Sequence, residues 1–411
     1  MTVAARHIGI ISSPTPGHLN PLQALGAALI AQGHRVTIVH VPGVDRFVTV
    51  PGIGFAALPH APEPIDAFFW KLAQPGGPIG LNRMIRATAA MTGTLLRHAP
   101  AVLERIGADA VIADAVEPAG PLIAARLGVP HVVSVTGLPL LAEESVPPPF
   151  LGWRYRTDAI GRMRNRGGYR VADRLMRPVT RVLDACRHEW GLAGDGPPPL
   201  VHVAQCPRGL DYPREALPPQ FRYGSPWRAA AAADPDVPED GRPLVFCSLG
   251  TLQGSRRGLF ATMAAACAMI GARAVIGHGG GLSPAEEAGL PGDPLVRAFW
   301  PQEAVLRGCA AAVLHGGFNT VLDALAAGVP IVALPIAFEQ PATAARLVRV
   351  GAGRALLPRW LGVRALAAAL DEVIRAPGYR AAARAIAGEM AAAGGAAGAA
   401  ATISAALARR A

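Results

Sequence analysis

Two residues near the start of the chain have the chemistry of a general base and of an acid that orients it. His18 follows a short apolar run at residues 8–12, and Asp114 ends another at residues 110–113. Loops that follow the strands of a wound parallel sheet share one edge, so both side chains are expected there. A neutral imidazole held at Nδ1 by Asp114 would leave Nε2 free to take a hydroxyl proton. A turn histidine without a catalytic role is the alternative.

A second candidate site is the heptapeptide Leu-His-Gly-Gly-Phe-Asn-Thr at residues 314–320, which follows an apolar run and opens a predicted helix. Glycines such as Gly317 let the backbone approach a ligand. Free N–H groups at the helix start, with Asn319 and Thr320, suit a diphosphate. His315 can add a hydrogen bond or a positive charge. On this motif alone, a tight turn with an incidental histidine remains an equal alternative.

The residues around this motif favour a diphosphate site over an incidental turn. The tetrapeptide Phe-Trp-Pro-Gln at 299–302 precedes the motif, Asp323 lies one helical turn after Asn319, and Glu339 and Gln340 follow the next predicted strand. Together, residues 299–340 resemble the nucleotide-sugar signature of the UDP-glycosyltransferase family, whose GT-B fold has two facing domains.

That resemblance implies a role for each donor-site residue. The uracil-stacking position falls on Phe299, with Gln302 beside it, and Asp323 takes the ribose hydroxyls. His315, Asn319 and Thr320 take the diphosphate, and Glu339 and Gln340 hold the sugar hydroxyls. The family usually has Trp at the stacking position, and in this chain the Trp is shifted by one residue, to Trp300. The sequence therefore does not decide which of the two aromatic residues faces the base. Core packing is the alternative for both rings.

Further motifs were compared with the same family. Ser248 and Thr251 lie in a turn that resembles the family's small-residue turn facing the diphosphate, although an ordinary glycine turn would look the same. His18 and Asp114 match the family's catalytic base and orienting acid. Residues 277–281 are glycine-rich, but Leu282 breaks the dinucleotide-binding fingerprint.

No metal or cofactor is expected. The acidic pair Asp234 and Asp236 sits in a segment rich in Pro and Ala and is interpreted as solvated linker. The UDP-sugar would be a co-substrate. The charge of its leaving group would be stabilised by the helix N-terminus and His315.

These motifs need a scaffold of two wound α/β domains. The chain has 411 residues, too many for one ordinary core. Short apolar strands alternate with predicted helices in both halves, the first helix spanning residues 21–32 with Asn20 as its cap. The predicted organisation ends in a helical tail that returns to the first domain, and its segments are an acceptor-binding domain at 1–217, a linker at 218–242, a UDP-sugar-binding domain at 243–385 and the tail at 386–411.

Composition limits location and partners. The formal charge of +10 implies attraction to anions. Arginine is not interleaved with aromatic residues as in nucleic-acid-binding modules, so no nucleic acid is expected. The five cysteines are widely spaced and are expected to be reduced. With no signal peptide or spanning segment expected, the predicted location is cytoplasmic.

Several segments of the first half, among them 114–120, 136–140 and 147–153, together with 337–346, resemble bacterial carotenoid glucosyltransferases of the zeaxanthin type. This resemblance implies UDP-glucose as the donor and a hydroxylated carotenoid as the acceptor. A macrolide or sterol glycosyltransferase is the nearest alternative. A sugar-nucleotide epimerase and a non-catalytic nucleotide-binding protein belong to other functional classes.

The segment 154–187 is strongly basic, with ten arginines against three aspartates. Apolar residues are interspersed along it, and it is predicted to be helical. Such a segment can lie on an anionic membrane at the inner face of the cell membrane. A solvated helix face is an equal alternative.

Overall fold

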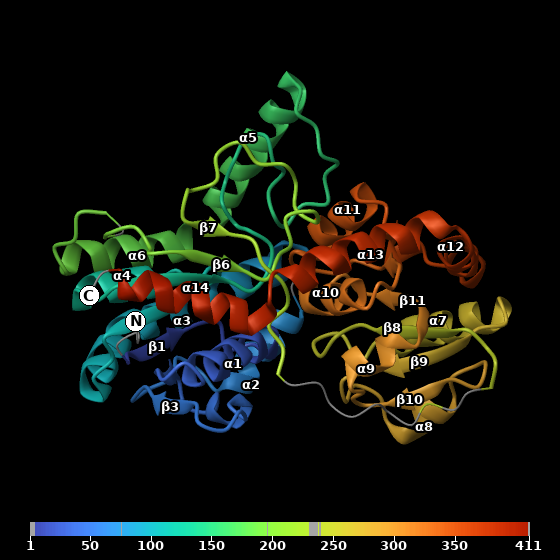
Figure 1. The fold of residues 1–411 in the computed structure, drawn as a ribbon, viewed down its shortest axis with the longest axis horizontal. Coiled ribbons are helices and arrows are strands. Elements are labelled where there is room, and N and C mark those ends of the chain that lie inside the picture. The colour runs from blue at the N-terminus through green and yellow to red at the C-terminus, as the bar shows by residue number, and fades with distance from the viewer. Residues whose placement is uncertain (1–4, 75, 195, 230–236, 238–239, 410–411) are drawn as a thin grey trace.

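The computed structural model describes residues 5–409 except 75, 195, 230–236 and 238–239. It has two wound α/β halves, as predicted (Figure 1). The strands of the first half form one parallel sheet in the order β3-β2-β1-β4-β5-β6-β7. They are β1 (His7–Ile11), β2 (Arg35–His40), β3 (Gly54–Ala57), β4 (Ala110–Asp114), β5 (His131–Val135), β6 (His202–Ala204) and β7 (Phe221–Arg222). The helices of this half are α1 (Pro16–Ile30), α2 (Ile65–Ala73), α3 (Gly77–Ile106), α4 (Ala119–Leu127), α5 (Ala159–Leu175) and α6 (Arg177–Glu189), with a 3-10 turn η1 (Asp45–Phe47).

The second half is a parallel six-stranded sheet in the order β10-β9-β8-β11-β12-β13. Its strands are β8 (Leu244–Ser248), β9 (Arg273–Gly277), β10 (Leu295–Arg297), β11 (Cys309–Leu314), β12 (Ile331–Ala333) and β13 (Gly353–Ala355). The helices after β8 are α7 (Arg257–Met269), α8 (Pro284–Ala288), α9 (Gln302–Arg307), α10 (Phe318–Ala326), α11 (Gln340–Arg349), α12 (Val363–Arg375), α13 (Pro377–Ala392) and α14 (Gly395–Ala408), with a 3-10 turn η2 (Pro358–Trp360).

Both sheets are built from short, mostly apolar strand sequences. All five residues of β1 are buried, and so are all five of β4. Strands buried on both faces are typical of parallel sheets covered by helices on each side. This arrangement places the loops after β1, β4, β8 and β11 at the carboxyl edges of their sheets, where ligands bind in such folds.

The first helix begins earlier than predicted. The sequence predicts a helix over residues 21–32 capped by Asn20, whereas α1 begins at Pro16 and has Thr15 at its N-cap. Proline fits the first turn of a helix because the N–H that it lacks would have no intrahelical partner there. Asn20 therefore lies inside α1 and does not cap it. His18 lies on the first helical turn rather than in the preceding loop.

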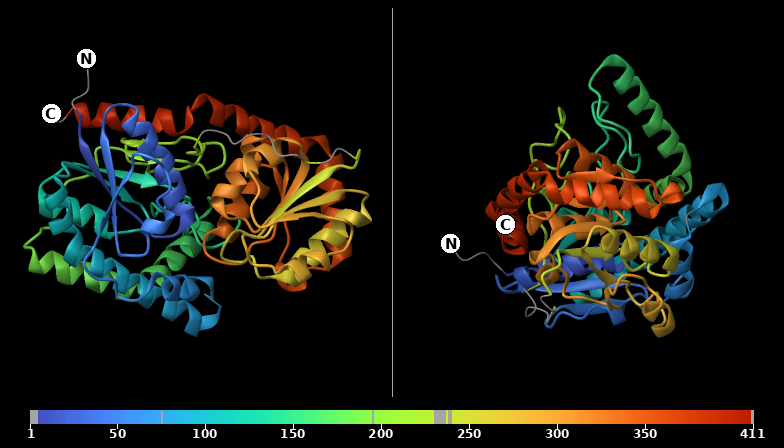
Figure 2. Two further views of the ribbon diagram at one scale, coloured as in Figure 1. Left: turned by 90° about the horizontal axis from the view of Figure 1, so that it is seen from below. Right: turned by 90° about the vertical axis from the view of Figure 1, so that its right-hand side faces the viewer.

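The chain returns to the first half at its C-terminus. Helices α13 and α14 run along both halves and bring the C-terminal end beside the start of the chain (Figure 2). Ala400, Ile403 and Leu407 of α14 belong to the core of the first half. In addition, the Ser404 hydroxyl lies 2.9 Å from Nε2 of His34, just after α1. The tail is thus part of the first domain's packing.

The structure also draws the boundary at the linker differently. Strand β7 and the buried Trp227 lie inside the predicted linker 218–242 but pack with the first half. Their apolar side chains complete that half's sheet and core, which the proline-rich composition of the segment obscures. Asp234 and Asp236 lie outside the described residues.

Among the described helices, only one bent pair near the C-terminus could be considered as a membrane span. No single one is both long and apolar enough to cross a bilayer. Helices α13 and α14, which meet at a bend of 42°, satisfy the criteria of length and composition only as a pair. Residues of α13 such as Ile386 and Met390 pack in the core at the domain interface, and Ile403 packs in the first half.

The five cysteines are all buried and free.

Candidate active site

His18 and Asp114 lie together at the carboxyl edge of the first sheet. Asp114 ends β4, and its Oδ2 is 2.8 Å from Nδ1 of His18. Because a carboxylate only accepts hydrogen bonds, Nδ1 carries the proton and Nε2 is left without one. Thr136, just after β5, donates to Oδ1 of Asp114 at 3.2 Å and lies 2.7 Å from Nδ1 of His18.

The electrostatics of this pair favour protonation of His18. Burial lowers the pKa of His18, but the charge of Asp114, the hydrogen bond to it and the charge of Glu339 outweigh burial and raise the pKa above its ordinary value of 6.5. Asp114 is fully buried, whereas the His18 side chain remains 24% exposed. The imidazole is therefore both oriented and accessible, as a group that exchanges a proton with a ligand must be.

The His-Gly-Gly motif lies between β11 and α10 at the carboxyl edge of the second sheet. Gly316 has φ +84°, a left-handed conformation that favours glycine. A Cβ atom on Gly317 would lie 2.3 Å from Nε2 of His315, and one on Gly250 would lie 2.8 Å away. Glycine at both positions therefore leaves room for the imidazole. Nδ1 of His315 is buried without a hydrogen-bond partner.

His315 is neutral around pH 7. Its burial lowers the pKa to about 4, although the neighbouring backbone of Ser248 opposes this fall. Of the two roles that the sequence left open for His315, the structure favours hydrogen bonding over a positive charge.

Gly317 is the N-cap of α10, no side chain caps this helix, and its first turn has no acidic residue. Asn319 and Thr320 lie in that first turn. The helix start is thus left open to an anion.

Ser248 and Thr251 flank the same place from β8. Ser248 ends the strand, and its hydroxyl accepts a hydrogen bond from the backbone N–H of Gly250 at 3.3 Å. The carbonyl of Ser248 accepts from the backbone N–H of His315 at 3.2 Å. Thr251 is exposed in the loop that follows. This turn therefore borders the His315 loop directly.

The two neighbouring aromatic residues have different environments. Trp300 is partly buried, its indole N–H donates to the carbonyl of Ile276 at 2.9 Å, and the guanidinium of Arg297 lies 4.1 Å from its ring centre. Phe299 is 69% exposed. Trp300 is thus engaged in packing, which leaves Phe299 as the ring available for stacking.

The Asp323 carboxylate is held in place by two side chains. It accepts from Nε of Arg228 at 2.6 Å and from the amide of Gln302. Burial raises the pKa of Asp323, although Arg228 and Gln302 oppose the rise. Asp323 also borders an open groove of about 610 Å³, which Arg228 and Glu303 help to line.

Sequence reasoning missed Arg228 and Gln205. Besides holding Asp323, Arg228 donates to the carbonyl of Asn319 at 3.1 Å and to Oε1 of Gln205 at 2.9 Å. The Gln205 amide donates to the carbonyl of Thr136 at 2.8 Å and to Oδ1 of Asn319 at 3.2 Å. These bonds connect the second-half motif with the residue that contacts His18. Neither residue lies in a recognisable motif, so no sequence signal pointed to them.

Glu339 and Gln340 begin α11. Phe338, just before them, has φ +55°, an uncommon conformation for a bulky side chain that costs on the order of 1–3 kcal/mol. Burial raises the pKa of Glu339, which is close enough to His18 for their charges to interact. The Gln340 amide oxygen accepts from the backbone N–H groups of Ile336 and Ala337 at 2.8 and 2.9 Å. Its oxygen thus braces the loop, which leaves its NH₂ as the group for a ligand.

The two halves of the site touch directly. The side-chain amide of Asn319 donates to the carbonyl of Gly17 at 2.6 Å, so the starts of α10 and α1 meet. A Cβ atom on Gly316 would lie 3.1 Å from the carbonyl oxygen of Gln340, so the start of α11 adjoins the same place. Three helix N-termini, each with a positive partial charge, therefore converge beside His18 and His315.

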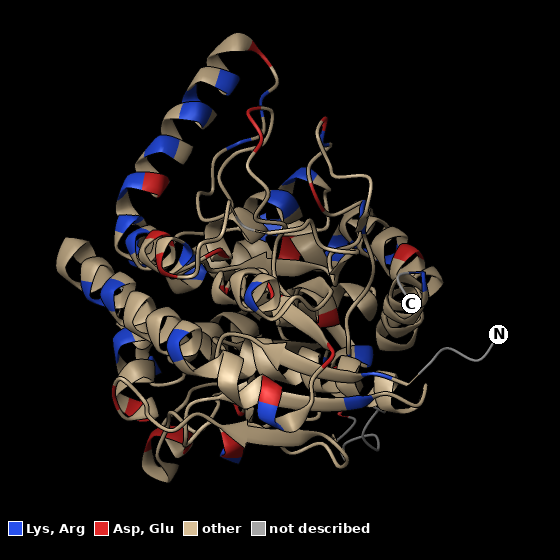
Figure 3. Cartoon of the chain, turned by 90° about the vertical axis from the view of Figure 1, so that its left-hand side faces the viewer, with Lys and Arg blue, Asp and Glu red and all other residues tan. Residues whose placement is uncertain are grey.

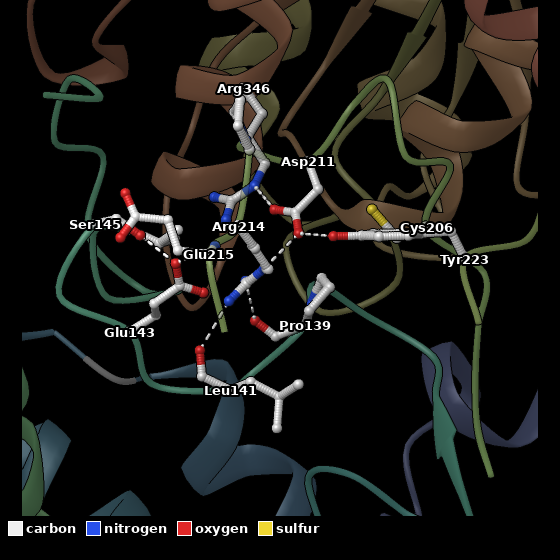
Figure 4. A network of polar contacts seen from close by, with 12 residues as sticks. Pro139, Leu141, Glu143, Ser145, Cys206, Asp211, Arg214, Glu215, Tyr223 and Arg346 are labelled. Atoms are coloured by element: carbon white, nitrogen blue, oxygen red, sulfur yellow. Dashed lines mark hydrogen bonds and ion pairs between the residues drawn. The ribbon is translucent and has the colours of Figure 1, made fainter. Parts of the chain in front are cut away.

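A buried ion pair also joins the halves (Figure 4). Arg346 of α11 donates to Oδ1 of Asp211 at 2.9 Å, and both side chains are fully buried. Arg214 donates to the other carboxylate oxygen at 2.7 Å and to the carbonyls of Pro139 and Leu141. Through these two arginines, Asp211 connects α11 with the loop after β5. Gln340 begins this helix, and Thr136 begins this loop.

The part of the chain that the structure describes holds no cluster of metal-ligating side chains. Within it, His, Cys, Asp and Glu side chains nowhere gather in a group of three or more that could hold a metal ion.

Comparisons with known proteins agree with this arrangement. Residues 282–405 match the family model described as Erythromycin biosynthesis protein CIII-like, C-terminal domain. The chain is 35% identical over 362 residues to a zeaxanthin glucosyltransferase from Pantoea ananas, an alignment that covers 85% of this chain and 84% of the relative.

Solved structures show the same fold. The glycotransferase of kitacinnamycin superposes with a TM-score of 0.79 at 23% identity, covering 98% of this chain and 99% of the other. A glycosyltransferase from Streptomyces sp. SF2575, complexed with thymidine diphosphate, superposes with a TM-score of 0.68 at 22% identity, covering 97% and 99%. The facing wound domains and the 35% identity over most of both chains establish the family: this protein is a GT-B glycosyltransferase and belongs to the UDP-glycosyltransferase family that includes the zeaxanthin glucosyltransferases.

Proposed function

We propose that the enzyme transfers glucose from UDP-glucose to a hydroxyl of an apolar acceptor, specifically a hydroxylated carotenoid, with inversion at the anomeric carbon. The observation that carries this proposal is the 2.6 Å hydrogen bond between Asn319 and Gly17. It joins the anion-binding start of α10 to the helix turn that carries His18. A proton acceptor and a diphosphate site thereby adjoin each other.

In the proposed reaction the acceptor hydroxyl gives its proton to Nε2 of His18 while its oxygen attacks the anomeric carbon. The bond from this carbon to the diphosphate oxygen breaks, and UDP leaves with the electron pair. His18 becomes an imidazolium that the Asp114 carboxylate stabilises. A single displacement of this kind inverts the configuration, so the anomeric configuration of the product reports on the mechanism.

The proposal needs no metal ion. The leaving diphosphate gains negative charge, and the N-termini of α1, α10 and α11 together with a hydrogen bond from His315 stabilise it. A chelator is expected to leave the rate unchanged. A strict requirement for Mg²⁺ would remove this part of the proposal.

The choice of UDP rests on the family and on Asp323. A carboxylate that accepts from both ribose hydroxyls favours a ribonucleotide over a deoxyribonucleotide, which has only one of them. The solved relative with bound thymidine diphosphate makes thymidine-diphosphate sugars the second candidate donors. Exposed Phe299 supports stacking on either base, so the ribose decides between them.

A product assay tests the function. UDP-glucose and dTDP-glucose are each supplied with hydroxylated carotenoids, sterols and macrolides, and products are identified by mass spectrometry. The expected result is glucosylated carotenoid from UDP-glucose, with UDP released only when acceptor is present. Glucosylation of a macrolide or sterol alone would replace the acceptor, and an interconverted UDP-hexose without acceptor would indicate an epimerase.

A cytoplasmic location is part of the proposal. The five free and buried cysteines are compatible with a reducing compartment. The corresponding test is fractionation of cells that express the tagged full-length chain. A marker protein for each compartment is followed in parallel.

A further inference from the structure

Helix α5 has the reverse of the usual amphipathic arrangement. Its buried residues are Gly161, Asn165 and Gly168, none of which is a large apolar residue. A Cβ atom on Gly168 would lie 2.8 Å from the ring of Trp153, so glycine permits close packing here. The Asn165 amide donates to the carbonyl of Glu144 at 2.8 Å. Small and polar residues therefore fix α5 to the preceding loop.

Large apolar residues of α5 lie on its outer side. Ile160, Met163 and Val171 are 61%, 61% and 60% exposed, and Leu175 is 46% exposed. Their spacings of three, eight and four residues place them along one side of the helix. Burying apolar side chains normally stabilises a fold, but more than half of Ile160, Met163 and Val171 stays exposed to solvent. A row of four such residues on one helix indicates a contact surface.

Arginines accompany this apolar row. Helix α5 carries five of them and a single acidic residue, Asp173. Arg162 and Arg166 pair with Glu215 and Glu144. Within the part of the chain that the structure describes, the exposed Arg170 and Arg174 form no ion pair. Figure 3 shows basic residues along the length of the projecting helix.

The start of α6 also carries exposed arginines without acidic partners among the described residues. Arg177 and Arg181 of α6 are exposed and, among described residues, have no acidic partner. Helix α5 stands out from the body of the molecule (Figure 1). A projecting row of unneutralised arginines beside a row of large apolar side chains suits a surface that is negatively charged outside and apolar beneath.

We propose that the outer side of α5 docks on an anionic lipid bilayer. Its arginines would meet the headgroups, and Ile160, Met163 and Val171 would enter the boundary with the acyl chains. A symmetric pairing of two copies through α5 is disfavoured, because a two-fold axis would bring the same arginine row against itself. The proposed contact rests on α5 and the start of α6 and does not depend on the identity of the acceptor.

The docking helix is connected to the site. The loop that holds α5 also approaches α11, since a Cβ atom on Gly152 would lie 3.0 Å from Cβ of Pro341, next to Gln340. A bilayer bound at α5 would thus be bound through a segment that packs beside the proposed sugar-binding residues. If the acceptor is apolar, as the proposed function holds, it dissolves in the bilayer, and this arrangement keeps the enzyme at the bilayer surface.

The test is flotation of the full-length protein with vesicles of phosphatidylcholine containing increasing phosphatidylglycerol. We expect binding to rise with phosphatidylglycerol and to fall with salt. The charge variant is Arg170→Gln, Arg174→Gln and Arg177→Gln. Each arginine near an anionic surface contributes on the order of a fivefold factor in affinity, so the triple variant should lose roughly a hundredfold. The apolar variant, Ile160→Ser with Val171→Ser, should lose binding at every salt concentration.

Matched controls lie elsewhere on the surface. Arg35, Arg105 and Arg364 are exposed arginines, and their change to Gln lowers the net charge equally. Met269 and Leu357 are 56% and 59% exposed, close to Ile160 and Val171, and their change to Ser matches the apolar variant. Both controls should bind like the wild type. Because all these residues are exposed, unchanged circular dichroism and melting temperature are expected throughout.

Three outcomes would overturn the proposal: no binding to anionic vesicles, binding that ignores the α5 variants, or equal losses in the controls. A fourth is a wild-type dimer by light scattering that the α5 variants convert to monomer, which would make this surface a protein interface. Vesicle binding uses no substrate, and glucosyl transfer can be measured without vesicles. Failure of the docking proposal is therefore distinguishable from failure of the proposed function.

Discussion

The side-chain amide of Asn319 donates a hydrogen bond of 2.6 Å to the carbonyl of Gly17, the residue before His18. One residue of the second domain is thereby fixed beside His18, the proposed base in the first domain. Asn319 also accepts a hydrogen bond from Gln205, so its orientation is set from two sides. The distance between the proposed base and the proposed diphosphate site depends on this contact.

The first prediction compares two substitutions of Asn319. Asn319→Ala removes the bond to Gly17, and kcat/KM should fall about tenfold, as for the loss of an ordinary hydrogen bond. Asn319→Asp also cannot donate, and its charge would in addition repel the diphosphate. Its kcat/KM should fall by about 10²–10³, as when an oxyanion-stabilising group is lost. Steady-state kinetics provide the measurement. If Asp behaves like Ala, no anion binds beside Asn319.

The second prediction concerns pH. The base must be neutral to accept a proton, and the pKa of His18 is raised above 6.5 by Asp114 and Glu339 against the effect of burial. The kcat/KM value should therefore fall as the pH decreases through a value above 6.5. Asp114→Asn removes the main raising charge and leaves burial, so the same fall should move to lower pH, with a reduced maximum. An unchanged acidic limb in Asp114→Asn would mean that another group titrates.

The third prediction separates sugar from nucleotide recognition at Gln340. Its amide oxygen braces the loop at Ile336 and Ala337, and its NH₂ remains for the sugar. Gln340→Ala should weaken UDP-glucose binding about tenfold. UDP itself has no sugar to lose contact with, so its affinity should stay close to that of the wild type. Calorimetry with both ligands provides the measurement. Equal losses for UDP and UDP-glucose would refute the assignment of Gln340 to the hexose.

The fourth prediction is thermodynamic and concerns the buried pair Asp211 and Arg346. Asp211→Asn leaves Arg346 buried without a compensating charge, which should cost about 3–5 kcal/mol of stability. The exposed pair Asp371 and Arg375 provides the control, and Asp371→Asn should barely change the unfolding midpoint. Denaturant unfolding of both variants is the measurement. Equal stability of Asp211→Asn and wild type would show that the interdomain pair contributes nothing.

The pH dependence of that pair has a definite sign. Burial raises the pKa of Asp211, but Arg346 and Arg214 outweigh burial and lower it below its ordinary value of 3.8. The resulting stabilisation is present above the pKa of the unfolded carboxyl and is lost as the pH falls through the lowered folded pKa. Asp211→Asn should therefore lie closest to the wild type in stability at the most acidic pH.

Much of the fold was readable from the sequence because apolar strands and glycine-bounded helices alternate regularly. The apolar runs at residues 8–12 and 110–113 overlap β1 and β4, and the predicted fold class is confirmed. The start of α1 was misplaced because Pro16 looks like a turn residue as well as a first-turn residue. Strand β7 was missed because two residues give no periodicity.

The candidate site was readable only where residues lie in motifs. His18 with Asp114, and Asn319 with Asp323, lie at loop and helix positions that wound sheets reserve for ligands, and the structure brings each pair to one edge. The roles assigned to them remain predictions. Arg228, Gln205 and Asp211 were missed because their importance arises from contacts between distant segments. Such contacts leave no local spacing in the sequence.

The most direct test of the central claim is a single-turnover measurement with His18→Ala, UDP-glucose and a hydroxylated carotenoid, with UDP-glucose affinity determined in parallel. The proposed mechanism predicts that product formation slows by about 10²–10⁴, the usual contribution of a general base. It also predicts that UDP-glucose affinity stays nearly intact, because the diphosphate is held by the other domain. Transfer at the wild-type rate by His18→Ala would contradict the mechanism.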